Sequence, residues 1–272
     1  MIRFSVNHDK EKLIELWRKV FGDSYEAINL FFDYHYDSHN TLVCELDGKI
    51  VSMLYLLEGD FVISNKSHPS YYLYAAATDP QHRGRGIMAQ MLEFAKQTAA
   101  YREMDYICLL PAENSLYAFY EKFGYKTVFR KKIAEIRING INVSQQSNCN
   151  DNDFAELRKV FLDDFDRFEW NNNDIEYAIR QHEFYGGKSI LSCKGYCLYS
   201  VEDSKIVVKE STLQPDCVFN NNTSIIINLP VDFQIDCVNS EVADCGMALP
   251  LNEEAEAAVY NIKNAYLGLT LD

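Results

Sequence analysis

One short segment of the chain carries the end of an apolar strand, a basic turn with two glycines and the start of an amphipathic helix. The segment reads ATDPQHRGRGIMAQMLEFAKQ, residues 76–96, and its apolar residues recur at helical spacing from Ile87 onward. A helix N-terminus presents unpaired backbone N–H groups and the positive end of the helix dipole, so it attracts phosphate. The two glycines let a ligand approach the backbone, and Arg83 and Arg85 add cationic donors. The segment therefore predicts a pyrophosphate site between a strand and a helix.

Two common phosphate-binding loops do not match this turn. The dinucleotide-binding fingerprint needs a third glycine and an acidic residue about 20 positions later, and both fit poorly here. The nucleotide-binding P-loop needs Gly-Lys-Ser/Thr, which is absent from the turn. The turn is therefore expected to be a phosphate-binding loop of another kind.

The first half of the chain predicts helices and strands that alternate around this turn, as in an α/β fold. The run DKEKLIELWRKVFGDS, residues 9–24, predicts an amphipathic helix with Leu13, Leu16, Trp17 and Val20 on one face. Asp47-Gly48 is a strong hairpin signal between two apolar runs. The further expected elements are strand 71–78, helix 86–101, strand 106–110, helix 115–123 and a strand that begins near Lys126.

The second half opens in a similar way after a polar segment. Residues 139–153, NGINVSQQSNCNDND, show no hydrophobic period and predict a linker. A helix and a hairpin that turns at Lys194-Gly195 are expected after it, but no basic glycine turn. The apolar face of that helix is expected to comprise Phe154, Leu157, Val160 and Phe161.

These patterns predict two domains. Residues 1–138 are expected to form the first domain, with its phosphate-binding turn. Residues 154–272 are expected to form a smaller, acidic α/β domain. Its similar opening is what a degenerate repeat of the first domain would show. The linker 139–153 separates the two.

Two motifs in the first half resemble those of the GNAT superfamily of N-acetyltransferases. The run QHRGRG, residues 81–86, is similar to the Gln/Arg-x-x-Gly-x-Gly/Ala signature that this family carries between its fourth strand and the next helix. The run NSLYAFYEKFGY, residues 114–125, resembles the second family motif, in which a tyrosine stands shortly before Gly-Phe or Gly-Tyr. The resemblance covers roughly residues 1–135 and implies the GNAT fold, with a mixed central sheet.

Within the superfamily, LLPAENSLYAFYEKFGY looks most like the Eis-like branch. That branch acetylates amines of aminoglycosides and other polyamines, and it has additional C-terminal domain material. Here the segments CGMALPL and AYLGLTLD resemble that material faintly.

The resemblance also implies roles for individual residues. Tyr120 would be the general acid, although Asn114 stands six residues before it, where the family has seven, and Leu116 occupies the place of a small residue. The backbone that holds the pantetheine and the acetyl carbonyl would be that of Ala76, Ala77 and Thr78. The pyrophosphate loop would comprise Arg83, Gly84, Arg85, Gly86, Ile87, Met88 and Ala89.

The end of the sequence, AYLGLTLD, is apolar and has no polar tail. In the Eis-like branch the C-terminal carboxylate is thought to reach the active site, and this ending resembles that arrangement. The resemblance therefore implies that Asp272 accepts the proton of the attacking amine. A strand that ends at the surface is the alternative.

Charge is divided unevenly along the chain. The formal net charge is −14; residues 1–140 hold 17 basic and 18 acidic side chains, and residues 141–272 hold 9 and 22. Nucleic acids and anionic membranes bind basic surfaces, so neither is expected as a partner. The acidic second half would suit a cationic small molecule as substrate. The alternative is that its charge only keeps the protein soluble.

The cysteines and the N-terminus indicate a metal-free cytoplasmic protein. None of the eight cysteines forms a Cys-x-x-Cys pair, so no metal site is expected. The start MIRFSVNHDK has no apolar signal-peptide core, and no run of about 18 apolar residues occurs.

The expected function is transfer of an acetyl group from acetyl-CoA to a primary amine of a small, cationic acceptor. Two alternatives stay open at this point. One is a non-catalytic sensor that binds acyl-CoA. The other is a transferase of aminoacyl or longer acyl groups, as in double-GNAT enzymes that act on charged tRNA, and the acidic second half disfavours it.

Overall fold

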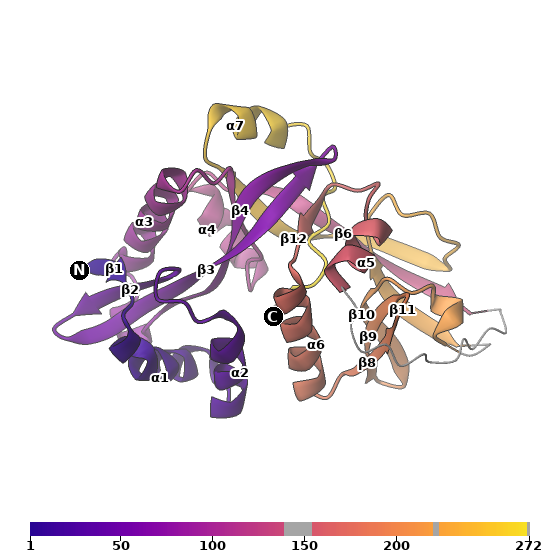
Figure 1. The fold of residues 1–272 in the computed structure, drawn as a ribbon, viewed down its shortest axis with the longest axis horizontal. Coiled ribbons are helices and arrows are strands. Elements are labelled where there is room, and N and C mark those ends of the chain that lie inside the picture. Colours follow the sequence, from indigo (N-terminus) through magenta and orange to yellow (C-terminus); the bar gives the residue numbers. More distant parts are fainter. Residues whose placement is uncertain (139–153, 220–222, 271–272) are drawn as a thin grey trace. The chain divides into compact units, whose positions relative to one another are not determined.

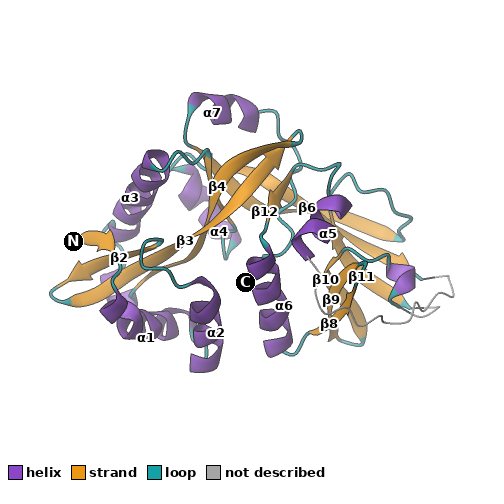
Figure 2. Ribbon diagram, viewed as in Figure 1, coloured by secondary structure: helices purple, strands orange, loops and turns teal. Residues whose placement is uncertain are grey.

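The computed structural model describes residues 1–138, 154–219 and 223–270, which form a mixed α/β protein (Figures 1 and 2). The chain divides into two compact units that interleave along the sequence. The first unit comprises Met1–Asp60, His68–Thr127 and Met247–Asn261, and the second comprises Phe61–Ser67, Val128–Gly246 and Ile262–Asp272. The expected linker 139–153 lies outside the described residues, so the division into 1–138 and 154–272 stays a prediction.

The first unit follows the strand order β1-β2-β3-β4-β5-β12, in which β4 and β5 are parallel and β1-β2, β2-β3 and β5-β12 are antiparallel. The β2–β3 turn has positive φ at Asp47 (49°) and Gly48 (75°), as the hairpin signal predicts. The expected helices and strands of residues 10–126 are confirmed. The bounds are β1 Ile2–Phe4, α1 Lys10–Phe21, α2 Tyr25–His35, β2 Thr41–Leu46, β3 Lys49–Ile63, β4 Lys66–Thr78, α3 Ile87–Tyr101, β5 Tyr106–Leu109, α4 Asn114–Glu121, β12 Asn239–Pro250 and α7 Glu253–Val259.

Helices cover both faces of the first unit's strands. The helices α1 and α2 lie on one side of β2 and β3, and α3 lies on the other (Figure 2). On the α1–α2 side, Trp17 and Phe31 contact the ring of Tyr74. On the other side, α3 and α4 pack on Leu73 and Leu109 in one apolar cluster. Within the described part of the chain, no helix is long and apolar enough to span a membrane.

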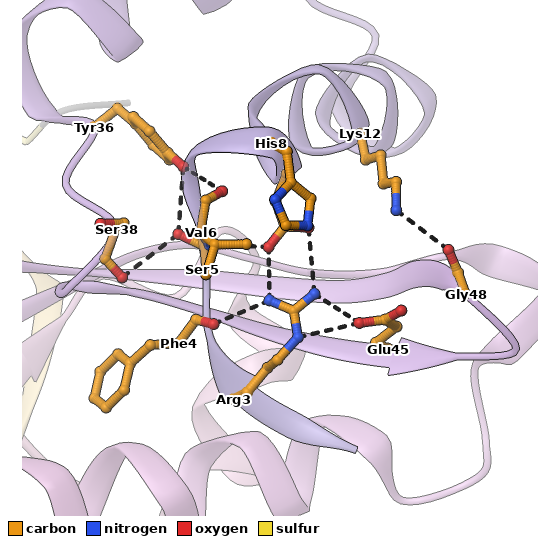
Figure 3. A network of polar contacts seen from close by, with 11 residues as sticks. Arg3, Phe4, Ser5, Val6, His8, Lys12, Tyr36, Ser38, Glu45 and Gly48 are labelled. Atoms are coloured by element: carbon orange, nitrogen blue, oxygen red, sulfur yellow. Dashed lines mark hydrogen bonds and ion pairs between the residues drawn. The ribbon is translucent and has the colours of Figure 1, made fainter.

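In the N-terminal strand the Arg3 guanidinium contacts Glu45 and the Phe4 carbonyl (Figure 3), and a buried carboxylate completes this network. Asp9 is fully buried and accepts hydrogen bonds from the Arg3 guanidinium (2.6 Å) and from the Val6 N–H (2.9 Å). Burial opposes ionisation, but these donors outweigh it and hold the pKa of Asp9 below its usual value. Arg3 also pairs with Glu45 of β2 at 2.6 Å, so the network joins β1 to its neighbouring strand.

The second unit follows the strand order β12-β6-β11-β10-β9-β8, with β7 paired to β3. The β8–β9 hairpin turns one residue earlier than expected, because Gly195 already pairs with Ser192. A Cβ at Gly195 would lie 2.2 Å from the Thr212 hydroxyl, so glycine serves a close approach inside the strand here. The bounds are β6 Lys126–Arg137, α5 Phe154–Phe161, β7 Arg167–Glu169, α6 Asn172–Phe184, β8 Lys188–Ser192, β9 Gly195–Glu202, β10 Lys205–Ser211 and β11 Ser224–Leu229.

The buried face of α5 differs from the expected one. Val160 is 69% exposed, whereas Arg158 is 1% exposed. Positions 154, 157, 158 and 161 share one helical face. The prediction placed the apolar Val160 on that face instead of the charged Arg158. An arginine was not expected inside because a buried charge needs a partner, and here that partner is distant in sequence.

That partner is Glu210, which is 2% exposed and accepts from Arg158 Nε at 2.9 Å. Arg158 also donates to the carbonyls of Phe168 (2.8 Å) and Leu267 (3.2 Å). A Cβ at Gly268 would lie 2.1 Å from a Glu210 oxygen, so the chain after Leu267 passes directly over the ion pair. The pair thus ties α5, β10 and the segment near residue 267 together.

We expect Arg158→Ala to lower the free energy of unfolding by about 3–5 kcal/mol, because it leaves the Glu210 carboxylate buried and uncompensated. The matched control is Arg180→Ala, which removes an exposed ion pair with Glu176 and should cost below about 0.5 kcal/mol. Urea unfolding of both variants measures the difference. Equal, small effects would contradict this account of the pair.

Candidate functional site

The strands β4 and β5 part where the phosphate-binding turn was expected. They pair in parallel at Ser70–Tyr72 opposite Tyr106–Cys108; β4 then continues to Thr78, whereas β5 ends at Leu109. Ala75 has a φ of 46°, a left-handed conformation that a non-glycine residue seldom adopts. Strained residues of this kind cluster at functional sites, and ligands of open sheets bind beyond the carboxyl ends of parallel strands.

The three residues after this bend are fixed from the β3 side. The Ser52 hydroxyl donates to the carbonyl of Ala77 at 2.7 Å and lies 3.0 Å from the Thr78 hydroxyl. The Asp79 N–H donates to the carbonyl of Val51 at 2.9 Å. The end of β4 is therefore held on one edge, although its pairing with β5 has stopped.

Asp79 shapes the turn that follows. Its carboxylate pairs with Lys19 of α1 at 2.7 Å and accepts from the Gln81 N–H at 3.0 Å. The hydrogen bond from Lys19 lowers the pKa of Asp79, despite the opposing effect of burial. A short 3-10 turn, Pro80–His82, begins at this cap and leads into the glycines.

Gly84 and Gly86 have φ values of 75° and 73°, the left-handed conformation that favours glycine. A Cβ built at either position would meet no protein atom within 4 Å, so conformation rather than crowding requires glycine here. Gly86 is the N-cap of α3, and its carbonyl accepts from the Gln90 N–H at 3.2 Å. The N–H groups of 87–89 precede that first helical bond and are oriented as an anion site requires.

The two arginines of the turn are exposed and contact its backbone. Arg83 Nε donates to the carbonyl of Thr78 at 3.1 Å, and Arg85 Nη2 donates to that of Gln81 at 3.4 Å. A guanidinium has five N–H donors, so each of these contacts leaves donors for an anion. The turn therefore fits a pyrophosphate by its backbone and by its charge.

Tyr120 lies at the end of α4 in the same apolar cluster as Ile87, with Ala76 and Met88 packed against that cluster. Its side chain is 8% exposed, and burial raises the pKa of Tyr120 to about 12. The phenol is therefore protonated at neutral pH, as a proton donor must be. Asn114 is exposed at the first position of α4.

Tyr120 and the start of α3 thus belong to one apolar cluster of the first unit, whereas Asp272 lies outside the described residues. Among the described residues 265–270, Ala265 and Tyr266 make only isolated bridges, and Leu267 and Leu269 are fully buried. Among the described residues, no group of three or more His, Cys, Asp or Glu side chains is placed to hold a metal ion.

A groove of about 930 Å³ lies beside α1 and the β2–β3 turn. Its lining has both charge signs, including Glu15, Lys19 and Lys49, and it shares only Asp79 with the turn after β4. The chemistry assigned by the motifs lies elsewhere, so this groove is not the expected cofactor site.

Sequence reasoning missed the strained Ala75 and the Ser52 contact. Alanine carries no left-handed preference, so the bend had no local signal. The contact between β3 and the end of β4 depends on strand pairing, which a motif does not encode.

The chain is similar to known proteins both in its sequence, through a family model, and in its fold, through solved structures. An acetyltransferase (GNAT) domain model matches residues 1–128, and no curated protein matches the sequence. A GCN5-related N-acetyltransferase from Anabaena variabilis is similar over 93% of this chain and 73% of its own (TM-score 0.73, 14% identity). Eis1 from Mycobacterium abscessus is similar over 95% of this chain and 75% of its own, with a TM-score of 0.68 and 13% identity. A GCN5-related N-acetyltransferase from Kribbella flavida is similar over 94% of this chain and 73% of its own, with a TM-score of 0.70 and 12% identity. At these identities the structures establish a shared fold. Residues 1–128 of the chain therefore belong to the GNAT acetyltransferase family.

Proposed function

We propose that this protein transfers an acetyl group from acetyl-CoA to the primary amine of a small, cationic acceptor. The observation that carries the proposal is the parted end of β4 followed by a left-handed glycine turn at the start of α3, in a GNAT domain. Together these features supply a free strand edge and an anion site next to each other.

The turn binds the pyrophosphate of the acyl donor. The backbone N–H groups of Gly84, Gly86 and 87–89 would donate to phosphate oxygens, and the guanidinium groups of Arg83 and Arg85 would add charge. The left-handed glycines keep the turn in the required shape without side chains over the ligand.

The end of β4 holds the reacting thioester. The backbone of Ala76, Ala77 and Thr78 lies past the last pairing with β5, so an N–H there can donate to the acetyl carbonyl. Such a donor stabilises the oxyanion that forms when the amine attacks, and a donor held by fixed backbone needs little reorganisation. The Ser52 and Val51 contacts supply that rigidity.

Tyr120 serves as the general acid. As the bond from the carbonyl carbon to sulfur breaks, the leaving thiolate takes the proton of the phenol. The free thiol and the acetylated amine are then the products, and Tyr120 regains a proton from the surroundings.

The acceptor is proposed to be cationic because the formal net charge of the chain is −14. An alkyl amine with a pKa near 10.4 is uncharged in only about one molecule in 2,500 at pH 7, so a base must take its proton. The side-chain carboxylate of Asp272 is the proposed base.

Acetyl-CoA consumption against a panel of amines tests the proposal. We expect the free thiol of CoA to be released in the presence of polyamines. The KM for a polyamine should rise with ionic strength more than the KM for a neutral amine, because salt screens exposed charges beyond about 8 Å. Binding of acetyl-CoA without turnover on any amine would contradict the proposal and indicate a sensor.

We expect Gly84→Glu and Gly86→Glu each to abolish acetyl-CoA binding in a folded protein, because a carboxylate would stand against the phosphates in a turn that needs left-handed backbone. Calorimetry measures the affinity. Gly186→Glu is the matched control: Gly186 also has a positive φ (85°) and open space at its Cβ, but lies after α6. Unchanged affinity in a folded Gly86→Glu protein would refute the assigned site.

We expect Tyr120→Phe to lower kcat by about 10²-fold or more, the scale of a lost proton donor, and to leave the affinity for acetyl-CoA unchanged. Because the pKa of Tyr120 is about 12, its ionisation should not limit the wild-type rate between pH 6 and 10. Steady-state kinetics across that range measure both effects. Tyr101→Phe, at an 89% exposed site on α3, is the control. Full turnover of Tyr120→Phe would exclude the acid role.

A further inference from the structure

The hydroxyl of Tyr125 is a buried polar group with no hydrogen-bond partner among the described residues. The side chain is 3% exposed. Its place is set by the end of α4: Gly124, at a φ of 90°, reverses the chain, and the Tyr125 N–H donates back to the carbonyl of Tyr120 at 3.3 Å. A Cβ at Gly124 would lie 3.2 Å from Leu249, so the turn is also packed closely against β12.

The neighbour of this hydroxyl is the proposed acid. The rings of Tyr120 and Tyr125 meet edge to face, with centroids 5.5 Å apart and planes at 65°. Burial raises the pKa of Tyr125 well above its usual value, and Tyr120 and Cys108 are the titratable groups that add to this effect. The other buried members of the cluster around the two rings, such as Met91, Met247 and Leu249, are apolar or lack an ionised group.

Such a hydroxyl destabilises the resting protein. Burying a polar group without a hydrogen bond is unfavourable, and phenylalanine would fill nearly the same volume without that penalty. Buried groups that lack partners are rare in native proteins, and a catalytic role is one of the explanations for them. The question is which state of the protein offers this hydroxyl an acceptor.

We propose that Tyr125 is a positioning residue for Tyr120, whose hydroxyl donates a hydrogen bond to the Tyr120 oxygen when that oxygen becomes negatively charged. The inference rests on the proposed function. The proton of Tyr120 passes to the leaving sulfur as its bond to carbon breaks, the Tyr120 oxygen keeps the electron pair, and Tyr125 retains its own proton. The two oxygens must then approach to about 2.6 Å, the length of a charge-assisted O–H···O bond.

This arrangement would stabilise the transition state selectively. In the resting enzyme the Tyr125 hydroxyl has no hydrogen-bond partner within the described parts of the chain. Once charge develops on Tyr120, the same hydroxyl gains an acceptor in an apolar surrounding, where hydrogen bonds to charged groups are strongest. Interactions made only in the transition state raise kcat and leave KM unchanged.

Tyr125→Phe tests the inference with three measurements on the whole chain. We expect the thermal midpoint to rise by about 2 °C or more, because an unsatisfied hydroxyl is removed. We expect kcat to fall about tenfold or more, with the KM for acetyl-CoA unchanged. We also expect the double variant Tyr120→Phe/Tyr125→Phe to be no slower than Tyr120→Phe alone, since Tyr125 acts through Tyr120.

Tyr106→Phe is the matched control, since the buried Tyr106 hydroxyl donates to the carbonyl of Ala255 at 2.9 Å. That variant should lose stability and keep its kcat. Wild-type kcat in Tyr125→Phe, a lowered thermal midpoint, or an equal loss of rate in the Tyr120→Phe background would each overturn the inference. Full activity of Tyr120→Phe would instead overturn the acid role itself, so the two failures are distinguishable.

Discussion

The parting of β4 from β5 is the constraint on which the rest of the candidate site depends. Parallel strands that stayed paired to their ends would satisfy the backbone of 76–78 within the sheet. Here the pairing stops at Tyr72, and Ala75 turns into a left-handed conformation that costs free energy of order 1 kcal/mol or more. The contacts from Ser52 and Val51 hold the released strand from its other edge. The end of β4 is therefore unpaired with β5 on one edge and held by β3 on the other.

Local chemistry determined which parts of this site the sequence could predict. The glycine turn and the start of α3 were predicted, because glycine tolerates backbone conformations that other residues avoid and because helical periodicity begins at Ile87. Ala75 was not predicted, since its bend is imposed by strand pairing and not by its side chain. The burial of Arg158 was missed for a related reason: its partner, Glu210, is 52 residues away in the sequence.

The fold, too, was predictable where a segment has its own local signal and not where it depends on distant residues. Every helix and strand expected between residues 10 and 126 is present, because each has its own hydrophobic period or turn residues. The segment Met247–Pro250 pairs with β5, more than 130 residues earlier, and the Asn252 side chain donates to Asp105 at 2.7 Å. No local pattern encodes that return. A polar run such as 139–153 indicates where a chain can be divided but not which distant strands share a compact unit.

Burial of Tyr120 has two opposing consequences for its proposed role. It keeps the phenol protonated, but a pKa of about 12 makes the phenol a weaker acid than an ordinary thiol, with a pKa near 8.5. Complete proton transfer to the thiolate would then be uphill by about 3–4 pKa units, or about 5 kcal/mol. A hydrogen bond to a charged group contributes about 1.5–3 kcal/mol, so a donor beside the Tyr120 oxygen would offset a large part of that difference. The apolar cluster offers few candidates for this donor, and the Tyr125 hydroxyl is the buried one that the resting structure leaves without a partner among the described residues.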